Sequence, residues 1–139
     1  MHYSEIIDKA YQFAIDAHNG QLRKYHGSPY IQHPCNVAQM VETYVKDNDI
    51  PYKTGIDMIS AAYLHDVIED CNIQKSELEK NFGPIITSYV VGMTNVSKVH
   101  SDLNRKERKA LDRKRMSLEC KEVKLIKLCD RIDNVRDFR

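Results

Sequence analysis

The segment LHDVIED, residues 64–70, brings one imidazole and three carboxylates together. His65, Asp66, Glu69 and Asp70 follow directly on the apolar run MISAAY. Three carboxylates repel one another, and burying them is costly unless a cation or a proton offsets their charge. A histidine beside an aspartate, with two further acids one turn later, is typical of half a metal site together with its acid–base partners. A solvated helix end would carry the same residues without any function. Residues elsewhere in the chain are therefore needed to distinguish a metal site from a solvated helix end.

A helix through this segment would carry the polar cluster on its buried side. We expect one helix with Thr54 as its N-cap, on which residues three and four apart share a face. His65 and Glu69 then continue the apolar stripe, and Asp66 and Asp70 lie one step round the helix. The pattern therefore favours a buried cluster over a solvated one.

Two residues elsewhere in the chain are candidates to complete a metal site. His33 precedes Pro34 where a loop enters a helix, and Asp130 lies on the apolar face of VKLIKLCDRIDN. Taken alone, His33 reads as a loop or core histidine and Asp130 as the ion-pair partner of Arg131. Two imidazoles and two carboxylates suit Mn²⁺, with Fe²⁺, Zn²⁺ and Mg²⁺ as alternatives. Such an ion would lower the pKa of a bound water.

The loop RKYHGSPYIQHP places cations near the candidate metal site. Arg23 and Lys24 lie about ten residues before His33, on a segment that Gly27 and Pro29 would fold back. Cations close to an activated water suit a phosphate-bearing substrate, because they neutralise charge that the metal does not reach. The alternative is that both are surface charges.

The composition predicts one all-helical domain. The chain has 139 residues, of which 42% are hydrophobic and 29% charged, and it contains few glycines and prolines. No segment alternates apolar and polar residues for long, so helices are favoured throughout. We expect six or seven helices around one core, approximately over residues 3–18, 34–46, 54–70, 74–82, 84–93, 105–118 and 121 onward.

Other sequence features bear on location and redox state. No apolar run approaches the ~20 residues that a membrane span requires, and MHYSEIIDKAYQ does not resemble a signal peptide. We therefore expect no membrane partner and a cytoplasmic location. The four cysteines include no CxxC pair, which argues for reduced thiols rather than a zinc ribbon or disulfides.

Charge is distributed unevenly along the chain. Residues 98–139 hold 14 Lys and Arg against 8 Asp and Glu, whereas residues 1–97 hold 7 against 12. A basic segment of this kind serves as a nucleic-acid surface, an anion-binding wall or a solvated helix. Because no aromatic residues are interleaved in 98–118, we favour the last two readings and expect no nucleic-acid partner.

The combination of these motifs resembles the HD-domain hydrolases of the RelA/SpoT class, especially small stand-alone alarmone hydrolases. The matching stretches cover more than half of the chain, in order. They are FAIDAHNGQLRKYHGSPYIQHPCNVA (13–38), AAYLHDVIED (61–70), FGPIITSYVVGMTNVSK (82–98) and KLIKLCDRIDNVRDF (124–138).

This resemblance implies a compact helical HD domain over residues 1–139 that hydrolyses the 3′-pyrophosphate of (p)ppGpp to GDP or GTP and pyrophosphate. It also implies a small nucleotide as the partner, and it leaves the oligomeric state open. Relatives usually carry one or two more helices after the last motif, so we expect a domain that lacks them. The implied site has three parts: one Mn²⁺ on His33, His65, Asp66 and Asp130; a catalytic pair, Glu69 and Asp70; and substrate contacts from Arg23, Lys24 and Asn134.

Some positions depart from the family pattern. Asn95 and Asp133 stand where the family frequently has Lys and His, so the rim of the pocket differs. Two alternatives therefore stay open: an HD-type phosphohydrolase acting on another nucleotide phosphate ester, and a nucleotide-binding module that does not hydrolyse. No segment resembles the family's synthetase domain.

Overall fold

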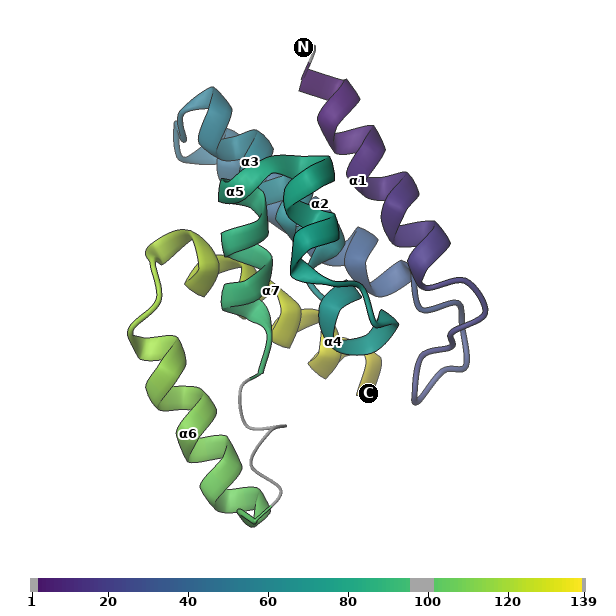
Figure 1. Cartoon of the computed structure of the whole chain (residues 1–139), viewed down its shortest axis with the longest axis vertical. Helices are drawn as coiled ribbons and strands as arrows, with labels where there is room; N and C mark the ends of the chain where they lie inside the picture. Colours follow the sequence, from purple (N-terminus) through teal and green to yellow (C-terminus); the bar gives the residue numbers. More distant parts are fainter. Residues whose placement is uncertain (1–2, 96–101, 139) are drawn as a thin grey trace.

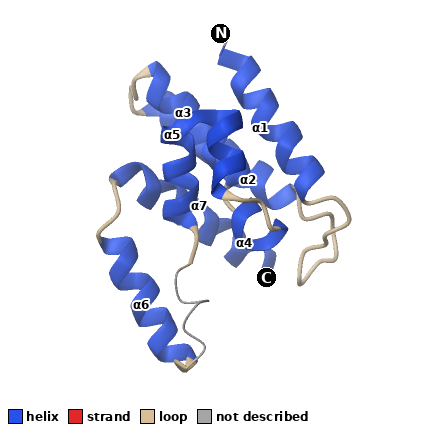
Figure 2. Ribbon diagram, viewed as in Figure 1, coloured by secondary structure: helices blue, strands red, loops and turns tan. Residues whose placement is uncertain are grey.

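The computed structural model describes residues 3–95 and 102–138, and these residues form a helical bundle (Figure 1). Among the described residues β pairing is limited to one isolated bridge between Leu22 and Pro29, so Figure 2 shows helices and loops alone. The all-α prediction is confirmed. The helices are α1 (Tyr3–Ala17), α2 (Gln32–Asp47), α3 (Tyr52–Leu64), α4 (Val67–Cys71), α5 (Lys75–Met93), α6 (Arg105–Ser117) and α7 (Lys121–Phe138).

Helix α3 lies at the centre of the core. From Gly55 to Leu64 every residue except Tyr63 is buried, and a helix buried on all sides must be surrounded by others. Helices α1, α2, α5 and α7 pack around it. Gly55 allows α2 to approach, because a Cβ there would lie 2.7 Å from Cγ1 of Val45. The central helix thus fixes where its last residues point.

The prediction of one helix from Thr54 through Asp70 is wrong. Helix α3 begins at Tyr52, after Pro51, and ends at Leu64, while α4 starts at Val67. Asp66 has φ −105° and ψ 0°, which interrupts the helix. Successive side chains on a continuous helix diverge by about 100°. The break therefore allows two consecutive residues, His65 and Asp66, to face the same point.

The predicted boundary at Gly83-Pro84 appears as a kink inside α5. Gly83 has φ 84° and ψ 175°, a backbone conformation that residues other than glycine rarely adopt. Pro84 then starts the second half of α5, where its missing N–H costs little. The two predicted short helices are thus present as the two halves of one kinked element.

Helix α6 extends away from the bundle in Figure 1, and none of its residues is buried. It starts with a capping box in which Asn104 and Glu107 satisfy each other's backbone N–H. Near its end the guanidinium of Arg115 pairs with Glu119 at 2.8 Å and donates to the backbone carbonyls of Gly92 and Thr94. Arg115 therefore ties α6 to the end of α5.

Two further sequence expectations concern the thiols and the membrane. All four cysteines are free. Among the described residues, no helix combines the length and the apolar character that crossing a bilayer requires.

Candidate metal centre

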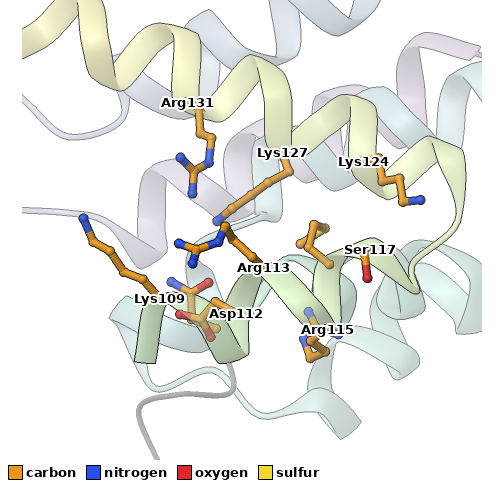
Figure 3. A pocket seen from close by; sticks show the side chains of 10 residues that line it. Lys109, Asp112, Arg113, Arg115, Ser117, Lys124, Lys127 and Arg131 are labelled. Carbon is orange, nitrogen blue, oxygen red and sulfur yellow. The ribbon is translucent and has the colours of Figure 1, made fainter. Parts of the chain in front are cut away.

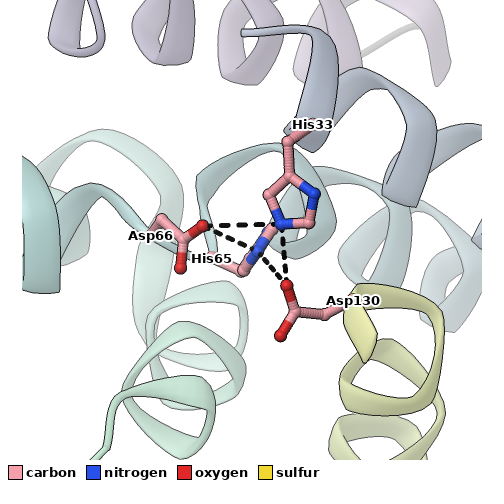
Figure 4. A group of neighbouring side chains, drawn as sticks. All are labelled: His33, His65, Asp66 and Asp130. Atoms are coloured by element: carbon pink, nitrogen blue, oxygen red, sulfur yellow. Dashed lines mark hydrogen bonds and ion pairs between the residues drawn. The ribbon is translucent and has the colours of Figure 1, made fainter. Parts of the chain in front are cut away.

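Four polar side chains from three parts of the chain converge beside the core (Figure 4). His33 comes from the start of α2, His65 and Asp66 from the break between α3 and α4, and Asp130 from α7. Nε2 of His33 lies 2.7 Å from Oδ1 of Asp130 and 3.7 Å from Oδ2 of Asp66. Nε2 of His65 lies 3.2 Å from the same Asp130 oxygen and 3.0 Å from the same Asp66 oxygen.

The second nitrogen of each imidazole is held by the protein. Nδ1 of His65 lies 2.7 Å from the carbonyl oxygen of Ala62, and Nδ1 of His33 lies 2.7 Å from Oδ2 of Asp133. A carbonyl oxygen accepts hydrogen bonds only, so Nδ1 of His65 carries the proton. Donation from Nδ1 orients a metal-ligating imidazole and directs the Nε2 lone pair inward. Both Nε2 atoms are therefore presented as ligands.

The electrostatics of the cluster require positive charge at its centre. Burial by itself lowers the pKa of His65, but Asp66 and Asp130 outweigh burial and raise that pKa well above its ordinary value. Burial raises the pKa of Asp66, yet the charge and the hydrogen bond of His65 bring it down to about 2. Burial also raises the pKa of Asp130, and hydrogen bonds from His33 and His65 pull it below its usual range. The carboxylates therefore stay ionised beside the positive charge of His65, and a bound cation can supply that charge in place of the imidazole proton.

A divalent metal ion satisfies this demand in both charge and geometry. The four donor atoms all lie within 4.8 Å of one another, and His33 and His65 are 1% and 2% exposed. Imidazole nitrogens and carboxylate oxygens coordinate Zn²⁺ at about 2.0–2.2 Å, so ligands of one such ion lie about 3 Å apart. The observed separations match that spacing, and the donor set fits a first-row divalent ion.

Asp133 belongs to this site, although the sequence analysis treated it only as a change at the rim. It is 4% exposed and holds His33 through Oδ2. Arg23 approaches the same oxygen at 3.0 Å, and the side-chain amide of Asn36 donates to Oδ1 at 3.0 Å. Its place three residues after Asp130, on the same face of α7, was the signal for this role.

Tyr30 is a second residue that sequence reasoning missed. Its hydroxyl donates to Oδ2 of Asp66 at 2.6 Å. Burial raises the pKa of Tyr30, and the nearby charge of Asp66 raises it further, so the phenol keeps its proton. Tyr30 therefore fixes the same Asp66 oxygen that the two imidazoles approach. It lies three residues before His33 in the loop PYIQHP, which was the available signal.

The predicted acid pair lies next to the four-residue cluster. Carboxylate oxygens of Asp66, Glu69 and Asp70 lie within 4.8 Å of one another, so Asp66 links the pair to the cluster. Oε1 of Glu69 accepts a hydrogen bond from the backbone N–H of Asn95 at 3.0 Å. The break after α3 and the short helix α4 thus place the candidate ligands and the predicted acid pair side by side.

The three predicted substrate contacts line one cavity beside the cluster. Arg23, Lys24 and Asn134 share it, and Nδ2 of Asn134 lies 3.3 Å from Oδ1 of Asp130. Arg23 is mostly engaged within the protein, since its Nε lies 3.4 Å from Asp137 in addition to the Asp133 contact. The geometry therefore leaves Lys24 and Asn134 as the more accessible contacts and gives Arg23 a positioning role as well.

Comparisons with known proteins agree with this architecture. A model of the HD domain family matches residues 10–139, and an HD domain implies a divalent metal ion. A solved structure described as "A metazoan ortholog of SpoT hydrolyzes ppGpp and plays a role in starvation responses" superposes with a TM-score of 0.79 at 32% identity. That match covers 95% of this chain and 69% of the other.

Two curated relatives are named guanosine-3′,5′-bis(diphosphate) 3′-pyrophosphohydrolase. The protein of Vibrio cholerae is 37% identical over 135 residues, and that of Aquifex aeolicus is 35% identical over 137 residues. The matches cover 95% and 96% of this chain, which spans only 18% of the length of each relative. By its family model, its fold and its relatives, the chain belongs to the HD domain family and, within it, to the RelA/SpoT class.

Proposed function

We propose that this chain is a hydrolytic domain that removes the 3′-pyrophosphate of (p)ppGpp, giving GDP or GTP and pyrophosphate. The observation that carries the proposal is the convergence of two imidazoles and two carboxylates beside an acid pair. The names of the relatives support the substrate, and the HD fold supports metal-dependent hydrolysis. The ion in this proposal is one Mn²⁺, held by His33, His65, Asp66 and Asp130.

The reaction adds water across the bond between O3′ and phosphorus. The water oxygen joins the phosphorus, the O3′–P bond breaks, and O3′ gains a proton. When bound, the ion acts as a Lewis acid that activates water and offsets phosphate charge. Glu69, oriented by the backbone of Asn95, takes the proton from the attacking water. Asp70 assists the departing O3′.

Other residues hold the site and the substrate in position. Asp133 and Tyr30 orient His33 and Asp66 through hydrogen bonds of 2.7 and 2.6 Å. Lys24 and Asn134 contact the substrate from the cavity that they line. Arg23 contributes to the same wall and steadies Asp133. In this proposal residues 1–139 form one HD hydrolase domain, which acts on a small nucleotide in the cytoplasm.

The decisive experiment uses metal-stripped protein incubated with ppGpp, with and without Mn²⁺. We expect Mn²⁺-dependent release of GDP and pyrophosphate in equal amounts, and loss of that release in Glu69→Gln at unchanged metal content. Release of orthophosphate would contradict the proposed bond cleavage. Metal binding without turnover of ppGpp, but with turnover of another nucleotide phosphate ester, would reassign the substrate.

A further inference from the structure

Two cavities flank the four-residue cluster and differ in their linings. The first, which we call the loop cavity, measures about 670 Å³ and is lined by Arg23, Lys24, Tyr25, Tyr30, Asn134 and Val135 among others. The second, which we call the α6–α7 cleft, measures about 580 Å³ and lies between those two helices (Figure 3). Its charged lining consists of six cations, Lys109, Arg113, Arg115, Lys124, Lys127 and Arg131, and one acid, Asp112.

The α6–α7 cleft borders both halves of the proposed active site. Nζ of Lys127 lies 3.6 Å from Oδ2 of Asp130, and Asn95, at the edge of the cleft, holds Glu69 through its backbone N–H. A group bound in the cleft would therefore lie next to a metal ligand and to the residue that handles water. The loop cavity borders the cluster too, through Asn134 and Tyr30.

The cations of the cleft differ in whether a carboxylate of the protein neutralises them, and Lys127 already lies 3.6 Å from Asp130. Arg115 is occupied by Glu119 and by the end of α5. Within the part of the chain that the structure describes, Arg113 and Arg131 have no carboxylate partner. Figure 3 shows the side chains of Arg113, from α6, and of Lys127 and Arg131, from α7, directed into the same space. Like charges so arranged repel one another until an anion binds between them.

The two linings suit opposite ends of one substrate. The loop cavity contains two tyrosines and a valine, which provide surface for a nucleoside, whereas the described lining of the cleft has no aromatic residue. The loop cavity also contains cations, namely Arg23, Lys24, Arg105 and Lys109, so the aromatic surface is what distinguishes it. Guanidinium and ammonium groups on two facing helices suit a small anion with many oxygens. Lys109 lines both cavities, and Asp130 is approached from each of them, by Asn134 at 3.3 Å and by Lys127 at 3.6 Å. A substrate that spans the two cavities would therefore pass beside the candidate metal ligands.

We infer that the α6–α7 cleft binds the departing pyrophosphate, while the loop cavity holds the nucleoside. This inference rests on the proposed function and extends it to Arg113, Lys127 and Arg131, to which neither the sequence motifs nor the comparisons assign a substrate contact. These residues bind the 3′-pyrophosphate group of the substrate and keep it bound after the O3′–P bond breaks. Pyrophosphate then becomes a product inhibitor that competes through the cleft.

The test measures binding of inorganic pyrophosphate and of GDP separately, by calorimetry on Mn²⁺-loaded protein with the ion in excess. Arg113→Ala with Arg131→Ala should weaken pyrophosphate binding by at least about tenfold, because two charge-assisted contacts are lost. GDP binding should change by less than about twofold. Lys24→Ala should show the reverse pattern, with weaker GDP binding and unchanged pyrophosphate binding.

The matched control removes two cations from the same helices outside the cleft. Lys114→Ala with Lys121→Ala makes the same change in net charge, and both residues are exposed. This control should bind pyrophosphate as the unmodified protein does. If the control and the cleft variant lose the same pyrophosphate affinity, the inference is overturned, because the loss would then depend on net charge alone. The basic segment could instead serve as a nucleic-acid surface, so binding of single-stranded RNA is measured as well. If the cleft variant loses affinity for RNA but not for pyrophosphate, the inference is overturned too.

The outcomes also separate this inference from the proposed function. If ppGpp is hydrolysed and the cleft variant retains full pyrophosphate affinity, the inference fails and the function stands. If pyrophosphate binds through the cleft but ppGpp is not hydrolysed, the cleft is an anion site and the proposed reaction fails. Hydrolysis of ppGpp is measured on the unmodified protein, and the variants are compared by their binding constants alone. Neither outcome therefore depends on the activity of the variants.

Discussion

The two faces of α7 carry charge in contrasting ways. On one face Asp133 meets His33, and Asp130 meets both His33 and His65, through contacts of 2.7–3.2 Å. On the other face Lys127 and Arg131 line an open cleft whose far wall, α6, buries none of its residues. The first region is organised before any substrate arrives, whereas the second requires a ligand to balance its charge. Substitutions should therefore act on metal retention in the first and on anion binding in the second.

The largest effect is expected from Asp130→Ala. This change removes a proposed ligand and leaves His33 and His65 facing each other without their shared acceptor. Turnover of ppGpp should fall by about 10⁴-fold or more, because both the ion and the arrangement of the water are lost. Metal content measured on the purified variant should fall with it. Asp112→Ala, an acid-to-alanine change on the cleft side, should keep its metal; if it loses the ion as well, the two faces are not independent.

Glu69→Gln should separate chemistry from metal binding. The amide still accepts a hydrogen bond from the backbone of Asn95 but takes no proton from water. We expect kcat to fall by about 10²–10³-fold with metal content unchanged. A variant that turns over normally would show that Glu69 does not handle the proton.

Asp133→Asn tests whether the cluster depends on its outer hydrogen bonds. The change keeps the shape of the side chain but removes the charge that holds Nδ1 of His33 and pairs with Arg23. Loss of such an outer carboxylate costs about 10–100-fold in metal affinity. Competition with a chelator would measure it. An unchanged affinity would mean that the cluster is positioned by the helices alone.

Asn104→Ala gives the smallest effect and probes the cleft side. It removes the capping box of α6, which is worth about 1 kcal/mol in an isolated helix. Because α6 contributes no buried residue, the midpoint of thermal unfolding should hardly move, while amide hydrogen exchange in α6 should accelerate. If the free energy of unfolding falls as much as it would after a substitution in the core, α6 is not the weakly attached helix that this prediction assumes.

The sequence predicted the parts of the cluster better than their arrangement. His33, His65, Asp66 and Asp130 could be chosen because buried imidazoles and acids on apolar faces need a common partner. The break between α3 and α4 could not be predicted, since the local pattern of residues 54–70 fits one continuous helix. Only the tertiary requirement that His65 and Asp66 point the same way interrupts it.

Residues that act through other side chains were harder to find. Asp133 and Tyr30 reach His33 and Asp66 from segments separated by 100 and 36 positions in the chain. The hydrophobic periodicity of a single segment gives no indication of a contact between distant segments. The boundary at Gly83-Pro84, by contrast, was predicted at the right place, because glycine and proline impose it through their own backbone geometry, although the two predicted helices are joined in one kinked element.

The hydrogen bond that orients Glu69 has a consequence for sequence variation. It comes from the main-chain N–H of Asn95, not from the side chain. Every amino acid except proline supplies that donor, so position 95 is free to drift without disturbing the acid beside the metal ligands. An asparagine at this position, where the resemblance leads us to expect lysine, thus leaves the orientation of Glu69 intact, and the residue lines the cleft as well.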